Sequence, residues 1–375
     1  MLLRTKIILV TLLVAVLMPL AFFVYRLSQT PPETTAIRDF SAPFVFGRFS
    51  VPEDNPLTEE AFRLGRRLFY DPLLSGNNEL SCASCHLQEL AFTDGLAKSV
   101  GISGEVLQFS SMTLANLMWG QRRFFWNGRT ETLEEQALIP IQHKDEMGQD
   151  LDELLKELKA SNEYRSLFHA AYGRITTDNV AKALSTFMRL LVSANSKYDQ
   201  YLRGEMKLSA EEEHGRKLFM AHPDVKVSLR GGNCIDCHSQ FLTSGFKDMF
   251  DGFSNNGLDN NEDLPIGLMA VTKDPAHRGL FKVPTLRNIA VTGPYMHDGR
   301  FQTLEDVMTH YNSGIKISET LSPLILEADN NKGDPDQARG LNMTAEEISA
   351  IIAFLHTLTD EEFLTNPKFS NPFDQ

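Results

Sequence analysis

The sequence has no excess of positive charge. Its 375 residues include 36 lysines and arginines against 49 aspartates and glutamates, which gives a formal net charge of −13. Nucleic acid is therefore not an expected partner, because its phosphates need a basic surface. The acidic surface instead suits steering toward a basic protein. With 42% hydrophobic and 23% charged residues, the composition is that of a folded chain of about two domains.

The sequence also lacks the sustained two-residue alternation that a large β-sheet requires. Helical patterns are present instead, for example the apolar face within residues 180–191 and the capping box that Thr344 forms with Glu347. The polar loops 259–261 and 329–331 have neither the glycine nor the terminal glutamate of an EF-hand, which excludes calcium by that route. The expected fold class is mainly α.

One long apolar run stands at the amino terminus. Arg4 and Lys6 precede the uncharged residues 7–25, and nineteen residues at about 1.5 Å per residue roughly cross a bilayer core. No small-x-small cleavage site follows, so residues 1–28 are expected to be an uncleaved transmembrane helix rather than a signal peptide. The flanking charges place the body outside the cytoplasm. Residues 29–44 are interpreted as a linker.

One pattern occurs twice along the chain. Gly65-Arg66-Arg67-Leu68-Phe69 and Gly215-Arg216-Lys217-Leu218-Phe219 each follow a similar polar lead-in, and each precedes a Cys-x-x-Cys-His signature. Such repetition predicts two related domains with a boundary near Gly204. We assign residues 45–204 to the first domain and residues 205–375 to the second.

No cysteine lies outside the two signatures, so none remains for a disulfide. The signature residues are Cys82, Cys85 and His86, then Cys234, Cys237 and His238. On a helix these positions share a face, so two thiols can form thioethers with a haem while the imidazole reaches the iron. Two covalently bound haem c groups are therefore expected. A Cys₄ zinc site is the alternative, although it has no need of the two histidines.

From Leu57 to Thr359 the chain resembles the bacterial dihaem cytochrome c peroxidases and the related MauG-type enzymes. The resemblance covers about four fifths of the chain and rests on residues 65–74, both haem motifs, and residues 125–129, 133–147, 281–288 and 294–299. It implies two tandem cytochrome c-like domains on the periplasmic side of the bacterial inner membrane, with soluble periplasmic protein as the alternative. It also implies that the amino-terminal haem is the peroxide site and that the carboxy-terminal haem receives electrons.

The resemblance implies roles for three further residues. Trp126 would lie between the haems, and Gln136 and Glu146 would lie on the distal side of the peroxide site. A carboxylate there can move a proton from one peroxide oxygen to the other. The ordinary alternatives are a core aromatic for Trp126 and a solvated loop acid for Glu146.

Two departures from the family pattern concern the axial ligands. No histidine occurs from Leu87 to Trp126, where many family peroxidases carry one that caps the iron, so this haem is expected to be open without prior activation. At the other haem, the alignment places Tyr311 where peroxidases have methionine and MauG-type enzymes have tyrosine. If Tyr311 only completes an apolar helical stripe, the sixth ligand is Met308 or Met296.

Family members often hold a calcium ion between the domains. The resemblance implies carbonyl ligands from Thr292 and Pro294, while Ser110 stands where an asparagine side chain is expected, which weakens the site. The tryptophan that MauG uses to oxidise its protein substrate is absent from residues 230–233.

The expected function is therefore a dihaem peroxidase that reduces hydrogen peroxide with electrons from a periplasmic cytochrome c, a cupredoxin or the quinol pool. A homodimer is compatible with this function. One alternative is a MauG-type oxidase that acts on a protein or organic substrate through high-valent iron, and the other is a dihaem electron-transfer cytochrome.

Overall fold

The computed structural model describes residues 34–37, 43, 46–119, 123–239, 252–331 and 340–374. The predicted membrane helix within residues 1–28 lies outside this set, as does most of the predicted linker. Within the described ranges, no helix is both long enough and apolar enough to cross a bilayer.

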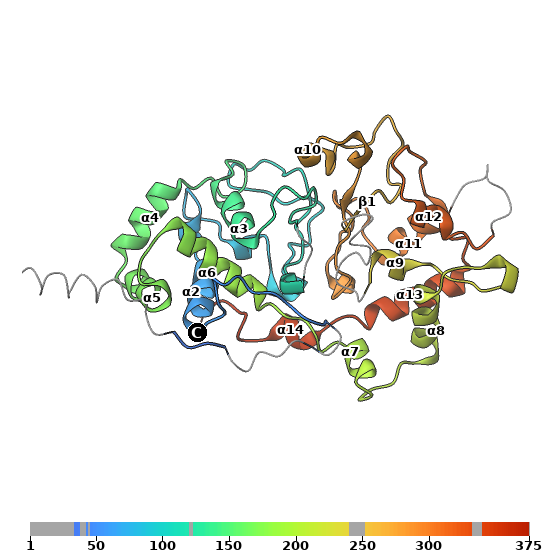
Figure 1. The fold of residues 1–375 in the computed structure, drawn as a ribbon, viewed down its shortest axis with the longest axis horizontal. Helices are drawn as coiled ribbons and strands as arrows, with labels where there is room; N and C mark the ends of the chain where they lie inside the picture. The colour runs from blue at the N-terminus through green and yellow to red at the C-terminus, as the bar shows by residue number, and fades with distance from the viewer. Residues whose placement is uncertain are drawn as a thin grey trace, which may run out of the picture.

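The described residues are mainly helical, and their only sheet has two short strands (Figure 1). The α-helices are α2 (Glu59–Tyr70), α3 (Leu133–Gln142), α4 (Leu151–Ala160), α5 (Asn162–Tyr172), α6 (Thr177–Arg189), α7 (Lys197–Leu202), α8 (Ala210–Met220), α9 (Cys234–Cys237), α10 (Met269–Thr272), α11 (Leu304–Ser313), α12 (Pro323–Glu327), α13 (Ala345–His356) and α14 (Glu361–Thr365). The 3-10 helices are η1 (Pro72–Leu74), η2 (Cys82–Ser84), η3 (Gln88–Leu90), η4 (Leu117–Trp119), η5 (Val225–Val227), η6 (Pro275–His277) and η7 (Ile289–Val291). Strands β1 (Phe253–Ser254) and β2 (Phe281–Lys282) pair antiparallel.

Each half of the chain is built on a pair of crossed helices, α2 with α6 and α8 with α13. The repeated glycine of the sequence motif lies at each crossing. A Cβ on Gly65 would lie 2.0 Å from the carbonyl oxygen of Ala183, and one on Gly215 would lie 1.8 Å from that of Ala350. Only glycine allows the two backbones to approach this closely, so the repeat seen in the sequence is also a repeat in the packing.

The chain end returns to the first half, although the sequence assigned residues 205–375 to the second. Phe363, Leu364 and Phe369 belong to the amino-terminal apolar core. The Tyr70 hydroxyl donates to the carbonyl oxygen of Phe369 at 2.7 Å. In Figure 1 the chain runs from α14, which lies between the halves, back toward α2. The last residues therefore tie the two halves together.

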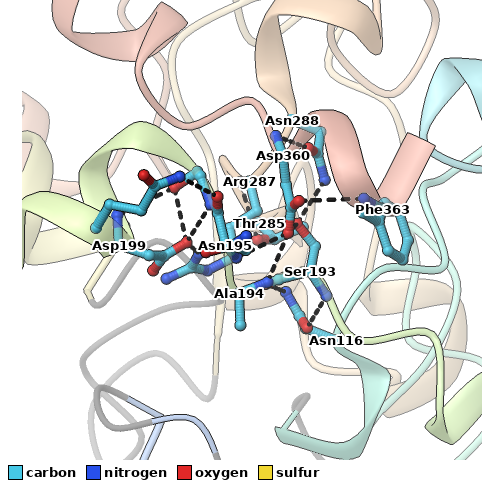
Figure 2. Close-up of polar contacts among 12 residues, drawn as sticks. Asn116, Ser193, Ala194, Asn195, Asp199, Thr285, Arg287, Asn288, Asp360 and Phe363 are labelled. Carbon is cyan, nitrogen blue, oxygen red and sulfur yellow. Dashed lines mark hydrogen bonds and ion pairs between the residues drawn. The ribbon is translucent and has the colours of Figure 1, made fainter. Parts of the chain in front are cut away.

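A buried polar network joins the halves around residues 193–195 (Figure 2). Oδ2 of Asp360 accepts from the main-chain N–H groups of Ala194 and Asn195, each at 2.8 Å, and from the Ser193 hydroxyl at 3.2 Å. The Asn288 side chain donates to the Ser193 hydroxyl at 3.0 Å and accepts from the Asp360 N–H at 2.8 Å. Since buried polar groups are costly to leave unpaired, these bonds hold the connecting segment in one arrangement.

An ion pair lies beside this network. Nη1 of Arg287 is 2.7 Å from Oδ2 of Asp199, and the two side chains are only 1% and 3% exposed. The guanidinium carbon of Arg287 also lies 4.3 Å from the ring centroid of Phe46. The pair connects the residue next to Asn288 with the first turn of α7.

Substitution of Asp199 by alanine is expected to lower the free energy of unfolding by about 3–5 kcal/mol, because it leaves the buried charge of Arg287 without a counter-ion. Denaturant unfolding of the holoprotein measures this loss. The control is Glu153→Ala, which removes one partner of an exposed pair with Lys156 and should cost less than about 1 kcal/mol. Equal losses in the two variants would contradict the role of burial.

Candidate active site

A cavity of about 1080 Å³ lies beside the first Cys-x-x-Cys-His signature. Cys82, Cys85 and His86 line it, together with three residues from later segments, Trp126, Gln136 and Glu146. All four cysteines of the chain are free of disulfides. The fold thus brings every residue predicted for the peroxide site to one cavity.

The two signature histidines are oriented by main-chain carbonyls. Nδ1 of His86 is 2.7 Å from the carbonyl oxygen of Phe92, and Nδ1 of His238 is 3.1 Å from that of Pro284. A carbonyl can only accept, so Nδ1 carries the hydrogen and Nε2 keeps its lone pair for a metal. Burial lowers the pKa of His86 and lowers that of His238 to about 4, which favours the neutral, ligating imidazole. The paired free thiols and these imidazoles fit covalently attached haems.

The distal wall carries an unpaired acceptor and a partly shielded carboxylate. Oε1 of Gln136 is buried and has no hydrogen-bond partner among the described residues. Oε1 of Glu146 lies 3.6 Å from Nη2 of Arg129 and 3.8 Å from Nδ1 of His143, with its side chain 20% exposed. Burial raises the pKa of Glu146, while the charges of Arg129 and His143 oppose that rise. Glu146 is therefore not the freely solvated acid of the alternative interpretation.

The backbone around Glu146 is held in place. The Ile102 N–H donates to the carbonyl oxygen of Glu146 at 2.8 Å, and the Glu146 N–H donates to that of His143 at 2.9 Å. A Cβ on Gly101 would lie 1.6 Å from the carbonyl oxygen of Asp145, so the two loops touch backbone to backbone. His143, the nearest later histidine, is half-exposed and lies beside Glu146.

The internal repeat explains why the two cavities differ. Helices α3 and α11 both begin with a threonine capping box, at Thr132 and Thr303, and both line a cavity. Eight residues after its cap, α3 has Pro140 and α11 has Tyr311. Proline carries no ligating atom, whereas tyrosine carries a hydroxyl. At this position the first cavity thus offers no side-chain ligating atom, whereas the second offers a hydroxyl.

The second cavity, of about 190 Å³, is lined by Cys234, Cys237 and His238 and by all three candidate sixth ligands, Tyr311, Met308 and Met296. Nδ2 of Asn256 donates to the Tyr311 hydroxyl at 3.1 Å and lies 3.4 Å from the Met296 sulfur. Met308 is buried in the apolar core. Burial raises the pKa of Tyr311 to about 12, and the hydrogen bond from Asn256 opposes that rise. The identity of the sixth ligand stays a prediction.

Trp126 lines both cavities and is buried. Its indole Nε1 donates to the carbonyl oxygen of Ser110 at 3.0 Å. Thr292 and Pro294, the predicted calcium ligands, line a small cavity of about 90 Å³ with Ser110 and Trp126. No carboxylate is among the described residues that line it, so the predicted calcium ion would depend on carbonyl and hydroxyl oxygens.

Sequence reasoning missed three residues of these sites. Arg129 and Lys282 belong to the motifs at residues 125–129 and 281–288, but the sequence alone does not show that their side chains line a cavity. Asn256 had no signal of any kind, because a polar residue in a loop is usually solvated.

The chain is similar to proteins of one family over most of its length. A family profile described as "Di-haem cytochrome c peroxidase" matches residues 59–207. Methylamine utilization protein MauG of Methylorubrum extorquens is 36% identical over 314 residues, which cover 83% of this chain and 81% of that protein. Cytochrome c551 peroxidase of Nitrosomonas europaea is 32% identical over 335 residues, with 86% and 84% covered.

Solved structures agree with these matches. The crystal structure of a MauG-like protein associated with microbial copper homeostasis superposes with a TM-score of 0.77 at 35% identity, and the match covers 89% of this chain and 99% of that one. The chain therefore belongs to the dihaem cytochrome c peroxidase and MauG family of oxidoreductases and has the mainly helical fold of that family.

Proposed function

We propose that this protein is a peroxidase that reduces hydrogen peroxide to water with electrons from a small periplasmic donor. One observation carries the proposal: the first cavity places Gln136 and Glu146 together and has Pro140 where the second cavity has Tyr311. When bound there, a haem supplies an iron with a face that peroxide can reach. The overall reaction takes one peroxide, two electrons and two protons to two waters.

The chain's own residues would bind peroxide and move its proton. Gln136 offers a carboxamide with a buried, unpaired oxygen that can accept a hydrogen bond from peroxide. The Glu146 carboxylate takes the proton from one peroxide oxygen and returns it to the other as the O–O bond breaks. Burial raises the pKa of Glu146, and the charges of Arg129 and His143 oppose that rise and so favour the carboxylate.

Electrons would enter at the second site and pass Trp126, which borders both cavities. The net charge of −13 suits a basic donor such as a cytochrome c or a cupredoxin, and the quinol pool is the alternative. The apolar run within residues 1–28 would hold the protein on the periplasmic side of the inner membrane.

A second candidate is a MauG-type oxidation of a protein or organic substrate. Tyr311 favours it, because a phenolate ligand would stabilise oxidised iron, and three of the relatives are MauG proteins. Mixing the full-length holoprotein with peroxide and reduced cytochrome c or cupredoxin separates the candidates. Rapid oxidation of the donor supports the peroxidase. Peroxide consumption without donor oxidation supports the second candidate, and inertness toward peroxide contradicts both.

Substitution of Glu146 by glutamine is expected to reduce peroxide turnover at least about a hundredfold, the scale of losing a proton-transfer group. Steady-state kinetics at matched haem content measure the loss. Glu105→Gln is the control, since Glu105 lines the same cavity but is exposed, and it should retain turnover. Unchanged turnover in the Glu146 variant would remove this carboxylate from the mechanism.

In the pH profile of kcat/KM for peroxide, the loss of activity at low pH should follow the pKa of Glu146. Its carboxylate form is the active one, so activity is lost as the pH falls through a pKa that burial has raised above the ordinary value of about 4.3. Arg129→Gln removes a charge that lowers this pKa and should move the loss of activity to higher pH. Asp145→Asn removes a charge that raises it and should move the loss to lower pH. Shifts in the same direction would contradict the assignment.

Substitution of Tyr311 by phenylalanine is expected to convert the haem of the second cavity from six- to five-coordinate, because the hydroxyl that would bind the iron is removed. Optical and electron spin resonance spectra of the ferric protein detect the change. Met308→Leu and Met296→Leu should leave the spectra as they are. If a methionine variant changes its spectrum and Tyr311→Phe does not, that methionine is the ligand.

A further inference from the structure

Lys282 is a buried cation for which the described part of the chain provides no anionic partner. Its side chain is 6% exposed. The ammonium donates to the carbonyl oxygen of Arg123 at 3.0 Å and lies 5.1 Å from the ring centroid of Phe124. No carboxylate of the described ranges pairs with it, and desolvation alone lowers the pKa of Lys282 to about 8, so it is mostly protonated at neutral pH.

Lys282 lines both large cavities, and its ammonium lies beside a ring of the first. Its main chain belongs to β2, in the second half of the protein, and its N–H donates to the carbonyl oxygen of Trp126 at 2.9 Å. The two groups that its ammonium contacts, Arg123 and Phe124, belong to the first half, and Phe124 lines only the first of the two large cavities. The second half thus contributes a cation to the site of the first half.

In the internal repeat, the counterpart of Lys282 carries no charge. Residues 109–116 and 281–288 share a Phe at the start and a Thr-Leu-x-Asn at the end, so Ser110 is the counterpart of Lys282. The Ser110 N–H donates to the carbonyl oxygen of His297 at 3.0 Å, which mirrors the bond from Lys282 to Trp126. The Ser110 hydroxyl, however, only donates to the carbonyl oxygen of Met296 at 2.9 Å. The counterpart of Lys282 is therefore a neutral group, and it lines the first cavity rather than the second.

A buried ammonium that lacks an anion is expensive, since its desolvation is not offset by ion pairing. The Lys282 ammonium has three hydrogens. The carbonyl of Arg123 accepts one of them, which leaves two for another acceptor. A haem carries two propionate carboxylates. Lys282 lines both large cavities, but Phe124, the ring beside its ammonium, lines only the first, which would hold the first haem. We propose that the Lys282 ammonium is the counter-ion of a propionate of the first haem and favours reduction of that haem over the second.

The expected consequence is directional electron transfer. A positive charge in a low-dielectric region stabilises an added electron nearby, and the stabilisation falls with distance. The charge lies on the side of the first haem, where the peroxide chemistry would take place. The inference rests on the presence of two haems in the proposed function, and it holds whichever reductant or substrate the enzyme uses.

The test is a spectroelectrochemical titration of full-length Lys282→Met holoprotein without peroxide or donor. We expect the reduction equilibrium of the first haem to shift toward the oxidised form by about tenfold, or about 59 mV for one electron, with the second haem unchanged. The propionate bending band of the first haem in the resonance Raman spectrum should shift as well. Lys282→Arg keeps the charge and should resemble the unmodified protein.

Lys207→Met is the matched control, since it removes the same charge from an exposed position and should leave both potentials unchanged. An unchanged potential and Raman band in folded Lys282→Met with two haems per chain would overturn the inference, as would equal shifts at both haems. If that variant loses haem, Lys282→Gln takes its place under the same criteria. Because no turnover is measured, the outcome is independent of the peroxidase assays.

Discussion

Two reciprocal main-chain hydrogen bonds set the relation between the cavities. The Lys282 N–H donates to the carbonyl oxygen of Trp126, and the Ser110 N–H donates to that of His297. Each bond crosses from one half of the chain to the other. Trp126 of the first half and Lys282 of the second half both line the two cavities. Under the proposed function, electron transfer between the sites would depend on this arrangement, because its rate depends on what separates them.

The two halves share one plan and differ at a few chemically decisive positions. The glycine at the helix crossing, the capped helix over the cavity and the histidine held by a carbonyl occur in both. The differences are Pro140 against Tyr311 and Ser110 against Lys282. The first pair decides which site has a side-chain hydroxyl at this helix position. The second sets a buried lysine, which lines both cavities, against a neutral serine. Divergence at equivalent positions therefore accounts for the proposed division of labour.

Much of this could be predicted from single residues and their spacing. The haem-binding residues follow from the Cys-x-x-Cys-His pattern, because thiols and imidazole must share a face within one turn. The duplication follows from Gly65 and Gly215 in the same context. The packing of the last residues could not be predicted in this way. Residues 205–375 were assigned to the second half, but Phe363 and Phe369 pack in the core of the first half. An apolar residue near the chain end does not reveal which core it joins.

The sequence by itself determined the two haem-binding motifs, the helical class and the family, because these depend on local spacing and on similarity along the chain. Only the tertiary structure decided that Glu146 lies near Arg129 and His143, that Asn256 hydrogen-bonds Tyr311, and that Lys282 is buried with no carboxylate of the described residues beside it. The pKa of a carboxyl and the environment of a charge are set by groups that approach through space. Lys282 and Arg123 are 159 positions apart, and only the packing of the two halves brings them together.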